Sequence, residues 1–226
     1  MDLGYQTDAA KKYDSFGTKS FVGDTVLMGA LNALALTGTT VLDFGCGNGR
    51  MAPVLLERGV AHVEGIDPST AMIENAQKLT STLSACDGAK LHFSRSEGAS
   101  LPFADASFDA IIAHFVFHYL PDPLTTANEL HRVLKPAGAF IATFNYFSFT
   151  QEGAKLKNQI VPILIGEKVR ADIYARGKDT LIGSIESAGF RILKTEPFDS
   201  RSAYVAPDFP GRDQMQFQNV MVVATK

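Results

Sequence analysis

Short apolar runs alternate along the chain with stretches in which apolar residues recur at helical spacing. The runs predict strands over 40–44, 61–67, 90–96, 108–114 and 139–147. The helically spaced stretches predict helices over 49–59, 69–84 and 122–135, the last with a proline in its first turn. Alternation of strands and helices implies parallel pairing with right-handed crossovers. The pattern therefore predicts a doubly wound sheet.

The C-terminal part departs from this alternation. A helix is expected over 179–189, followed by strands over 190–198 and 219–226 with no helix between them. Two strands without a crossover helix favour antiparallel closure of the sheet edge. We therefore predict an α/β fold with a Rossmann-like, seven-stranded sheet. It is mostly parallel, has an antiparallel last strand and carries helices on both faces.

One connection is unusually long. About 33 residues, 146–178, separate the fifth strand from the last helix, whereas a median connection has ~4–6 residues. The segment begins with aromatic residues and contains the apolar stretch IVPILI, in which Pro162 interrupts any single long helix. We expect a single domain over 1–226, with 146–178 forming a cap over the carboxyl edge of the sheet. The alternative is that this segment contacts a second copy in a homodimer.

Composition and charge narrow the class of protein. The 226 residues are 46% hydrophobic and 20% charged, which is ordinary for a globular protein. The net charge of −3 argues against nucleic-acid binding through broad electrostatics. The longest weakly polar run, 110–120, is too short for a membrane span, and no signal peptide is recognisable. With only Cys46 and Cys86, we expect a reduced, cytoplasmic protein.

The stretch VLDFGCGNG, residues 41–49, carries the strongest chemical signal. Gly45, Gly47 and Gly49 follow the first strand at every second position, where a ligand approaches the backbone closely. A nicotinamide fingerprint would need a third glycine where Arg50 stands, so an oxidoreductase is the weaker reading. Asp67 ends the second strand, 22 residues after Gly45, where a carboxylate accepts hydrogen bonds from ribose hydroxyls. An adenosine derivative fits this pattern.

Together these motifs resemble one family, the class I S-adenosylmethionine-dependent methyltransferases, and within it the type 11-like small-molecule group. The similar stretches are VLDFGCGNG, GIDPSTAM, SEGASLPFADASFDAIIAHFVFHYLPD, ELHRVLKPAGAFIAT and AGFRILKTEPF. The resemblance covers roughly residues 10–145 and 179–226. It implies S-adenosyl-L-methionine as cofactor and methyl transfer to a small-molecule acceptor by in-line displacement. The alternative is a non-catalytic protein that binds S-adenosylmethionine or S-adenosylhomocysteine.

The resemblance also implies the cofactor-binding residues. They are Tyr13, Asp43, Gly45, Cys46, Gly47, Asp67, Pro68, Met72, Ser96, Glu97 and Gly98. The glycine turn would hold the aminocarboxypropyl end at a helix start, and Asp67 the ribose. Glu97, whose side chain is longer, stands where the family often has an aspartate that reaches the adenine amino group. Residues 1–36, with Tyr13, would form an N-terminal helical lid.

The sequence says less about the catalytic residues and the pocket for the methyl acceptor. His114 and His118 lie where a base for the acceptor is expected, and we name them as catalytic candidates. Two histidines without a third ligand make a poor zinc site, so no metal is expected. The acceptor pocket is expected to include Tyr146, Phe147, Ile163 and Tyr174. Nucleic-acid and protein methylation remain alternatives. The absent amino-methylase motif after the fourth strand favours a small molecule.

Overall fold

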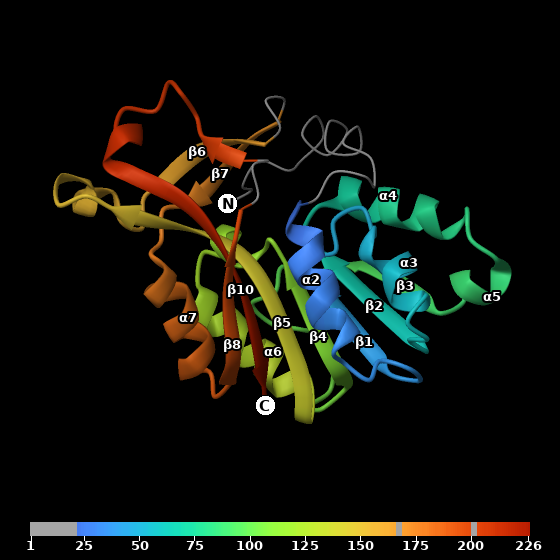
Figure 1. Cartoon of the computed structure of the whole chain (residues 1–226). Coiled ribbons are helices and arrows are strands. Elements are labelled where there is room, and N and C mark those ends of the chain that lie inside the picture. Colours follow the sequence, from blue (N-terminus) through green and yellow to red (C-terminus); the bar gives the residue numbers. More distant parts are fainter. Residues whose placement is uncertain (1–21, 166–168, 200–202) are drawn as a thin grey trace.

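The computed structural model describes residues 22–165, 169–199 and 203–226, and their arrangement is shown in Figure 1. The large sheet contains β1 (Thr40–Phe44), β2 (His62–Asp67), β3 (Leu91–Arg95), β4 (Phe108–His114), β5 (Leu134–Phe149), β8 (Arg191–Phe198) and β10 (Met215–Thr225). The helices are α2 (Val22–Asn32), α3 (Met51–Leu56), α4 (Thr70–Thr80), α5 (Ala85–Gly88), α6 (Pro123–Val133) and α7 (Lys178–Ser187). The remaining elements are β6 (Ile160–Ile165), β7 (Val169–Tyr174), β9 (Ala203–Val205), η1 (Phe117–Tyr119), η2 (Glu152–Leu156) and η3 (Arg212–Gln214).

The topology confirms the predicted fold class. The seven strands follow the order β3-β2-β1-β4-β5-β10-β8. The strands from β3 to β5 pair in parallel, whereas β10 is antiparallel to both of its neighbours. The last strand is inserted between β5 and β8, a position that the sequence pattern did not specify. The chain order reverses between β1 and β4, and ligands bind at the carboxyl ends of strands at such a reversal.

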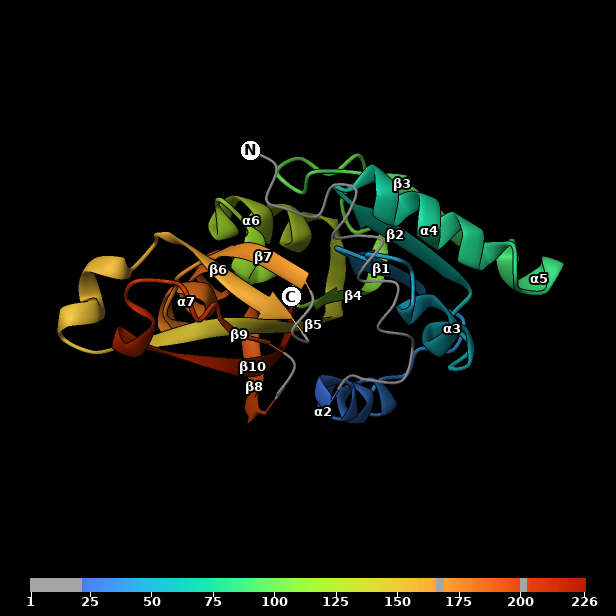
Figure 2. The ribbon, with the colours of Figure 1, turned by 90° about the horizontal axis from the view of Figure 1, so that it is seen from above.

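Helices cover both faces of this sheet, as Figure 2 shows from above. On one face, the α2 residues Leu27 and Leu31 share a buried core with residues of α3 and α4 and with alternate residues of the strands. On the other face, Leu130 of α6 and Leu181 of α7 belong to a second core. Burial of these two apolar layers, at roughly 25 cal/mol per Å² of apolar surface, is the main force that holds the sheet between its helices.

Two helix starts lie where the sequence predicts them. The Ser69 hydroxyl accepts a hydrogen bond from Met72 N at 3.4 Å and caps α4. The Asp122 carboxylate accepts from the backbone of Leu124 and Thr125, both at 3.1 Å, and caps α6. These side chains satisfy backbone N–H groups that have no partner within the helix. The cap of α4 also fixes the chain just after Asp67.

The segment after β5 does form a separate layer, but not from residues 146–178 alone. β6 pairs antiparallel with β7 and with β9, and β9 comes from the connection between β8 and β10. This small sheet lies beyond the carboxyl ends of the parallel strands in Figure 1. Arg176, which follows β7, ties this layer to the connection between η1 and α6, because its guanidinium donates hydrogen bonds to the carbonyls of Leu120 and Pro121.

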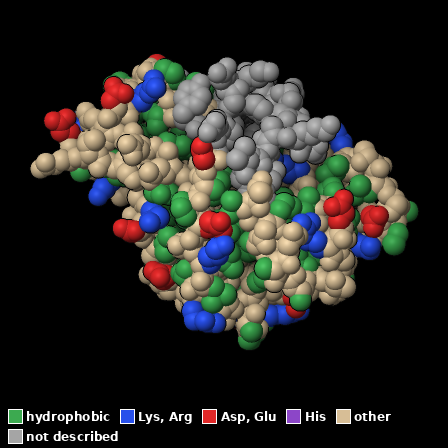
Figure 3. Space-filling model, viewed as in Figure 1, with side chains coloured by type: hydrophobic (Ala, Val, Ile, Leu, Met, Phe, Trp, Pro, Cys, Tyr) green, Lys and Arg blue, Asp and Glu red, His purple; other side chains and the backbone are tan. Residues whose placement is uncertain are grey.

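The described residues were also searched for charged patches, membrane-spanning helices and metal-binding clusters. In Figure 3, basic and acidic side chains are interspersed on the visible face. Among the described helices, none is long and apolar enough to cross a membrane. Within the same part of the chain, no group of three or more His, Cys, Asp or Glu residues is arranged to hold a metal ion.

Candidate functional site

The glycine turn between β1 and α3 has the backbone that its sequence demands. Gly45, Gly47 and Gly49 have φ angles of +72°, +53° and +78°, which lie in a region that is unfavourable for residues with a Cβ atom. A Cβ on Gly45 would lie 2.4 Å from the Val116 side chain. A Cβ on Gly47 would meet no described atom within 4 Å. Gly45 is therefore required by packing, whereas Gly47 faces open space.

Asp67 fixes this turn from the end of β2. One carboxylate oxygen accepts a hydrogen bond from Gly47 N at 3.0 Å, and the other accepts from Ser69 N at 2.8 Å. Burial raises the pKa of Asp67, and the two backbone donors oppose this shift. Each carboxylate oxygen has a second lone pair. The carboxylate is therefore held in place while it keeps the capacity to accept further hydrogen bonds from a ligand.

Asp43 lies on the central strand β1 and is almost completely buried, with 1% of its surface exposed. Burial raises its pKa from 3.8 to about 7, while the positive charge of Arg50 lowers it and the carboxylate of Asp67 raises it. Its Oδ2 atom has no hydrogen-bond partner among the described residues. A buried carboxyl oxygen without a partner is unfavourable. Asp43 is therefore suited to receive a donor or a cation from a ligand.

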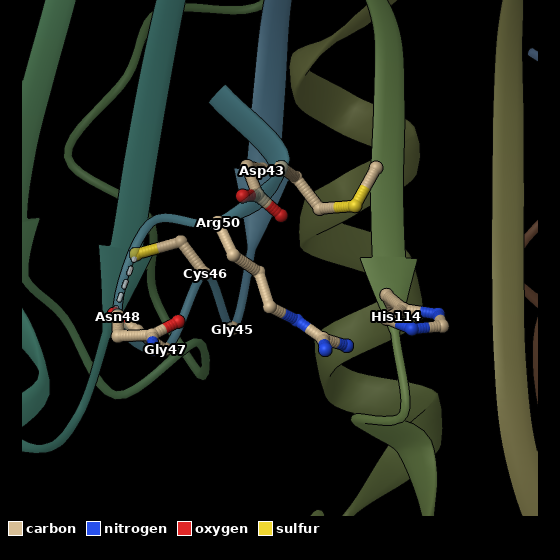
Figure 4. A pocket seen from close by; sticks show the side chains of 8 residues that line it. Asp43, Gly45, Cys46, Gly47, Asn48, Arg50 and His114 are labelled. Atoms are coloured by element: carbon tan, nitrogen blue, oxygen red, sulfur yellow. Dashed lines mark hydrogen bonds between the residues drawn. The ribbon is translucent and has the colours of Figure 1, made fainter. Parts of the chain in front are cut away.

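A cleft opens between the glycine turn and the end of β4 (Figure 4). It is lined by Asp43, Gly45, Cys46, Gly47, Asn48, Arg50, Met51 and His114. The Arg50 side chain extends from the turn toward His114 (Figure 4). The structure thus brings four predicted cofactor residues together with one predicted catalytic residue. Asn48, Arg50 and Met51 were not predicted, although Arg50 directly follows the third glycine.

The other predicted cofactor residues lie around Asp67 rather than in this cleft. Met72 is buried in the first turn of α4, while Pro68 is exposed and its carbonyl accepts from Arg95 Nε at 2.9 Å. Ser96 N donates to the carbonyl of Asp67 at 3.2 Å. The exposed Glu97 carboxylate pairs with Arg95 at 3.1 Å.

Gly98 and Cys46 were also predicted to bind the cofactor, and both have defined local surroundings. Gly98 has a φ of +80°, and a Cβ there would lie 2.7 Å from the Phe44 ring. Burial raises the pKa of the Cys46 thiol, so this cysteine stays protonated and is a poor nucleophile. Tyr13 and most of the predicted lid over 1–36 lie outside the described residues, apart from 22–36 with α2.

The two candidate catalytic histidines have different surroundings. His114 lines the cleft, and its Nδ1 lies 2.7 Å from the Thr143 hydroxyl. His118 is 1% exposed, and its Nδ1 accepts a hydrogen bond from Asn145 N at 3.2 Å. Burial, followed by the charge of Arg176, lowers the pKa of His118 to about 3. His118 is therefore neutral and already hydrogen-bonded, which favours His114 as the base.

The predicted acceptor residues do not form one exposed wall. Phe147 and Ile163, with 2% and 0% of their surface exposed, are part of the buried core of the small sheet. Tyr146 packs against the core beneath α6 and α7. The Tyr174 ring lies 4.2 Å from the Arg176 guanidinium. Phe147 and Ile163 thus stabilise the small sheet, and a role of these four residues in an acceptor pocket stays a prediction.

The pKa of Asp43 gives a testable pH dependence of stability. Its folded-state pKa of about 7 exceeds the unfolded value of 3.8, so the folded protein binds the extra proton between these pH values. Asp43 should therefore contribute a decrease in the free energy of unfolding as pH rises from about 4 to 7. His118, whose folded pKa lies below its unfolded value, contributes an increase over the same range, so the variant is compared with the wild type at each pH. Asp43→Asn removes this dependence, and above pH 7 it should stabilise the protein by on the order of 2–4 kcal/mol. Urea unfolding at both ends of this range measures the difference. A variant less stable than the wild type above pH 7 would contradict it.

Comparison with known proteins shows which proteins the chain is similar to. Residues 42–142 match the model of a methyltransferase domain, of type 11. The chain is 31% identical over 141 residues to the biotin biosynthesis bifunctional protein BioHC of Teredinibacter turnerae, covering 59% of this chain and 24% of that protein. It is 32% identical over 142 residues to the 2-methyl-6-phytyl-1,4-hydroquinone methyltransferase of Synechocystis, covering 62% of this chain and 43% of that protein.

Solved structures share the fold. An S-adenosylmethionine-dependent methyltransferase from Mesorhizobium loti has a TM-score of 0.67 at 18% identity, with 93% of this chain and 100% of that chain covered. The cyclase SpnF has a TM-score of 0.67 at 21% identity, with 90% and 80% covered. The chain spans 24% and 43% of the lengths of the two curated relatives named above. Residues 42–142 are thus similar to the type 11 methyltransferase domain, and the chain shares the fold of solved S-adenosylmethionine-dependent methyltransferases.

Proposed function

We propose that this protein transfers a methyl group from S-adenosyl-L-methionine to a small-molecule acceptor. One observation carries the proposal: the glycine turn is open at Gly47 and lies between the buried carboxyl group of Asp43 and the partly buried one of Asp67, with His114 on the opposite side of the cleft. This arrangement suits a ligand that has an amino-acid end and a ribose. It also places an imidazole beside the same cleft.

The residues present fit this cofactor. The unpartnered Oδ2 of Asp43 suits the ammonium group of its amino-acid end, and the nearby Arg50 suits the carboxylate. The remaining lone pairs of Asp67 suit the ribose hydroxyls. The open side of Gly47 leaves room for the ligand to approach the backbone. We therefore assign these four residues to cofactor binding, with Pro68, Met72, Ser96, Glu97, Gly98 and Tyr13 as proposed neighbours.

When bound, S-adenosyl-L-methionine supplies a methyl group whose bond to sulfur breaks with the electron pair leaving on sulfur. The chain must orient the acceptor, exclude water and accept a proton where the acceptor carries one. His114 is the proposed proton acceptor. If its Nδ1–H donates to Thr143 Oγ1, then Nε2 is left as the basic nitrogen. Thr143 thus acts as a positioning residue that orients the ring.

Several observations support a small acceptor. The relative from Synechocystis is named for a hydroquinone substrate. The surface in Figure 3 shows no broad basic region on its visible, described face. We propose the layer formed by β6, β7 and β9 as a cap over the acceptor region, with a homodimer contact as its alternative role. The reducing cytoplasm is proposed as the compartment, since the exposed Cys86 carries a free thiol.

Turnover with a panel of acceptors tests this proposal. Phenols, quinols, small amines and carboxylic acids should be scored for the formation of S-adenosylhomocysteine. We expect at least one class to be methylated, and His114→Asn should slow that reaction by about 100-fold or more, within the range of general base catalysis. The variant should keep its affinity for the cofactor. Tight cofactor binding with no turnover across the panel would instead favour the non-catalytic binding protein.

A further inference from the structure

A row of buried polar side chains crosses the sheet next to the cleft. His114 of β4 pairs in register with Thr143 of β5, and Asn145 stands two residues further along β5. Asn219 of β10 lies directly opposite Asn145. Because side chains alternate along a strand, these four residues share the face that carries α2. The row therefore continues the cleft from His114 toward β10.

Two amides in this row have unmet hydrogen-bonding capacity. Asn145 and Asn219 are 5% and 6% exposed, and the Oδ1 atom of each has no hydrogen-bond partner in the described part of the chain. Asn219 Nδ2 donates only a long hydrogen bond, at 3.4 Å, to the carbonyl of Phe198. Buried polar atoms are rarely left unpaired, because each costs free energy comparable to a lost hydrogen bond. Their presence side by side points to a partner from outside the chain.

The contact between the Asn145 amide and His118 does not supply the missing hydrogen-bond partner of the two amides. His118 Nδ1 accepts from Asn145 N, so the neutral ring carries its proton on Nε2, which lies 3.3 Å from Asn145 Nδ2. Turning the amide of Asn145 would give this proton an acceptor. The amide NH₂ group would then take the place of the oxygen, and Asn219 Oδ1 would stay as it is. In either orientation the pair offers polar atoms to a ligand.

Aromatic rings flank the two amides. Phe115 has a φ of +58°, a conformation that is unfavourable for a bulky residue. Its backbone N–H is held by both the carbonyl and the hydroxyl of Thr143, at 2.8 and 3.0 Å. Its ring lies 4.6 Å from that of His114 and 5.9 Å from that of Phe198. Strain of this kind persists where the surroundings impose it, often at functional sites.

We propose that Asn145 and Asn219 bind the hydroxyl group of the methyl acceptor, and that the acceptor is an uncharged, planar aromatic alcohol whose ring packs against Phe115 and Phe198. This inference rests on the proposed function and specifies its substrate class. Asn219 Oδ1 accepts from the hydroxyl hydrogen, and the NH₂ group of the turned Asn145 amide donates to the hydroxyl oxygen, while the two rings bind an apolar, planar body. The position of the row beside His114 places such a hydroxyl close to the proposed base.

Binding of naphthol and of naphthalene to the protein saturated with S-adenosylhomocysteine tests the inference. We expect the wild type to bind naphthol and to bind naphthalene at least about tenfold more weakly, since the unpaired amides reject a ligand without the hydroxyl. Asn219→Leu and Asn145→Leu should each remove this preference. Both variants should keep the affinity for S-adenosylhomocysteine, and Asn219→Leu, whose amide oxygen has no partner among the described residues, should not lower the melting temperature. Gln218→Leu, on the same strand but the opposite face, is the matched control.

The outcomes separate this inference from the function on which it rests. If S-adenosylhomocysteine does not bind the wild type, the proposed function fails. If it binds but naphthol does not, or if both Leu variants keep the naphthol preference, the assigned acceptor class fails alone. If the variants lose stability and cofactor affinity together, Asn145 and Asn219 have a structural role and the inference is overturned.

Discussion

Asp67→Ala should weaken the binding of S-adenosylmethionine and S-adenosylhomocysteine by about 100-fold or more. The substitution removes the proposed acceptor of two ribose hydroxyls, and hydrogen bonds to a charged group contribute about 1.5–3 kcal/mol each. It also removes the partner that holds Gly47 N at 3.0 Å, so the glycine turn loses its anchor to β2. Isothermal titration calorimetry measures the loss directly.

A matched control isolates the role of Asp67. Asp213 is an exposed aspartate in η3, outside the residues that line the cleft. Asp213→Ala removes the same charge and should leave both affinities within about twofold of the wild type, because an exposed charge this far from the site contributes little. If Asp67→Ala and Asp213→Ala bind equally well, the ribose site has been assigned to the wrong carboxylate.

Alanine substitutions at Gly45 and Gly47 should separate folding from cofactor binding. Both residues have positive φ, which costs about 1–2 kcal/mol for alanine. At Gly45 the added methyl group would also lie 2.4 Å from Val116, and such overpacking costs about 1–3 kcal/mol more. Gly45→Ala should therefore lower the free energy of unfolding by about 2–5 kcal/mol.

Gly47→Ala should have the opposite profile. No described atom lies within 4 Å of the added methyl group, so only the cost of the backbone conformation applies to stability. The methyl group would instead occupy the open side of the turn and should weaken cofactor binding by at least about tenfold. Denaturant unfolding and calorimetry on both variants test the pair. Gly47→Ala with unchanged affinity would mean that the ligand does not approach the turn on this side.

Local sequence patterns predicted the strands, helix starts and glycine turn that surround the proposed cofactor site. The apolar runs matched β1 and β4, and the capping residues Ser69 and Asp122 marked two helix starts. These features depend on neighbouring residues, as do the positive φ angles of the glycine turn. The positions of Asp43 on β1 and of Asp67 at the end of β2 could be predicted because the same pattern fixes both strands, and their roles in cofactor binding stay predictions.

Features that depend on contacts between distant segments could not be predicted. The fifth strand was predicted to begin at Ala139, because Pro136 and Gly138 suggested a break after the preceding helix. In the structure β5 begins at Leu134 and continues past these residues through an irregular pairing with β4. β9 joins the small sheet from the connection after β8. The burial of His118 likewise results from contacts with β5 and β7, and no local pattern signals it.

The cofactor specificity of the wild-type protein is the most direct test of this account. Calorimetric titrations with S-adenosylmethionine, S-adenosylhomocysteine and NADH should be run on the same preparation. The account predicts stoichiometric, tight binding of the first two ligands and no measurable binding of NADH, because the turn at Arg50 lacks the third glycine of a dinucleotide site. Binding of NADH together with no binding of either adenosyl ligand would contradict it.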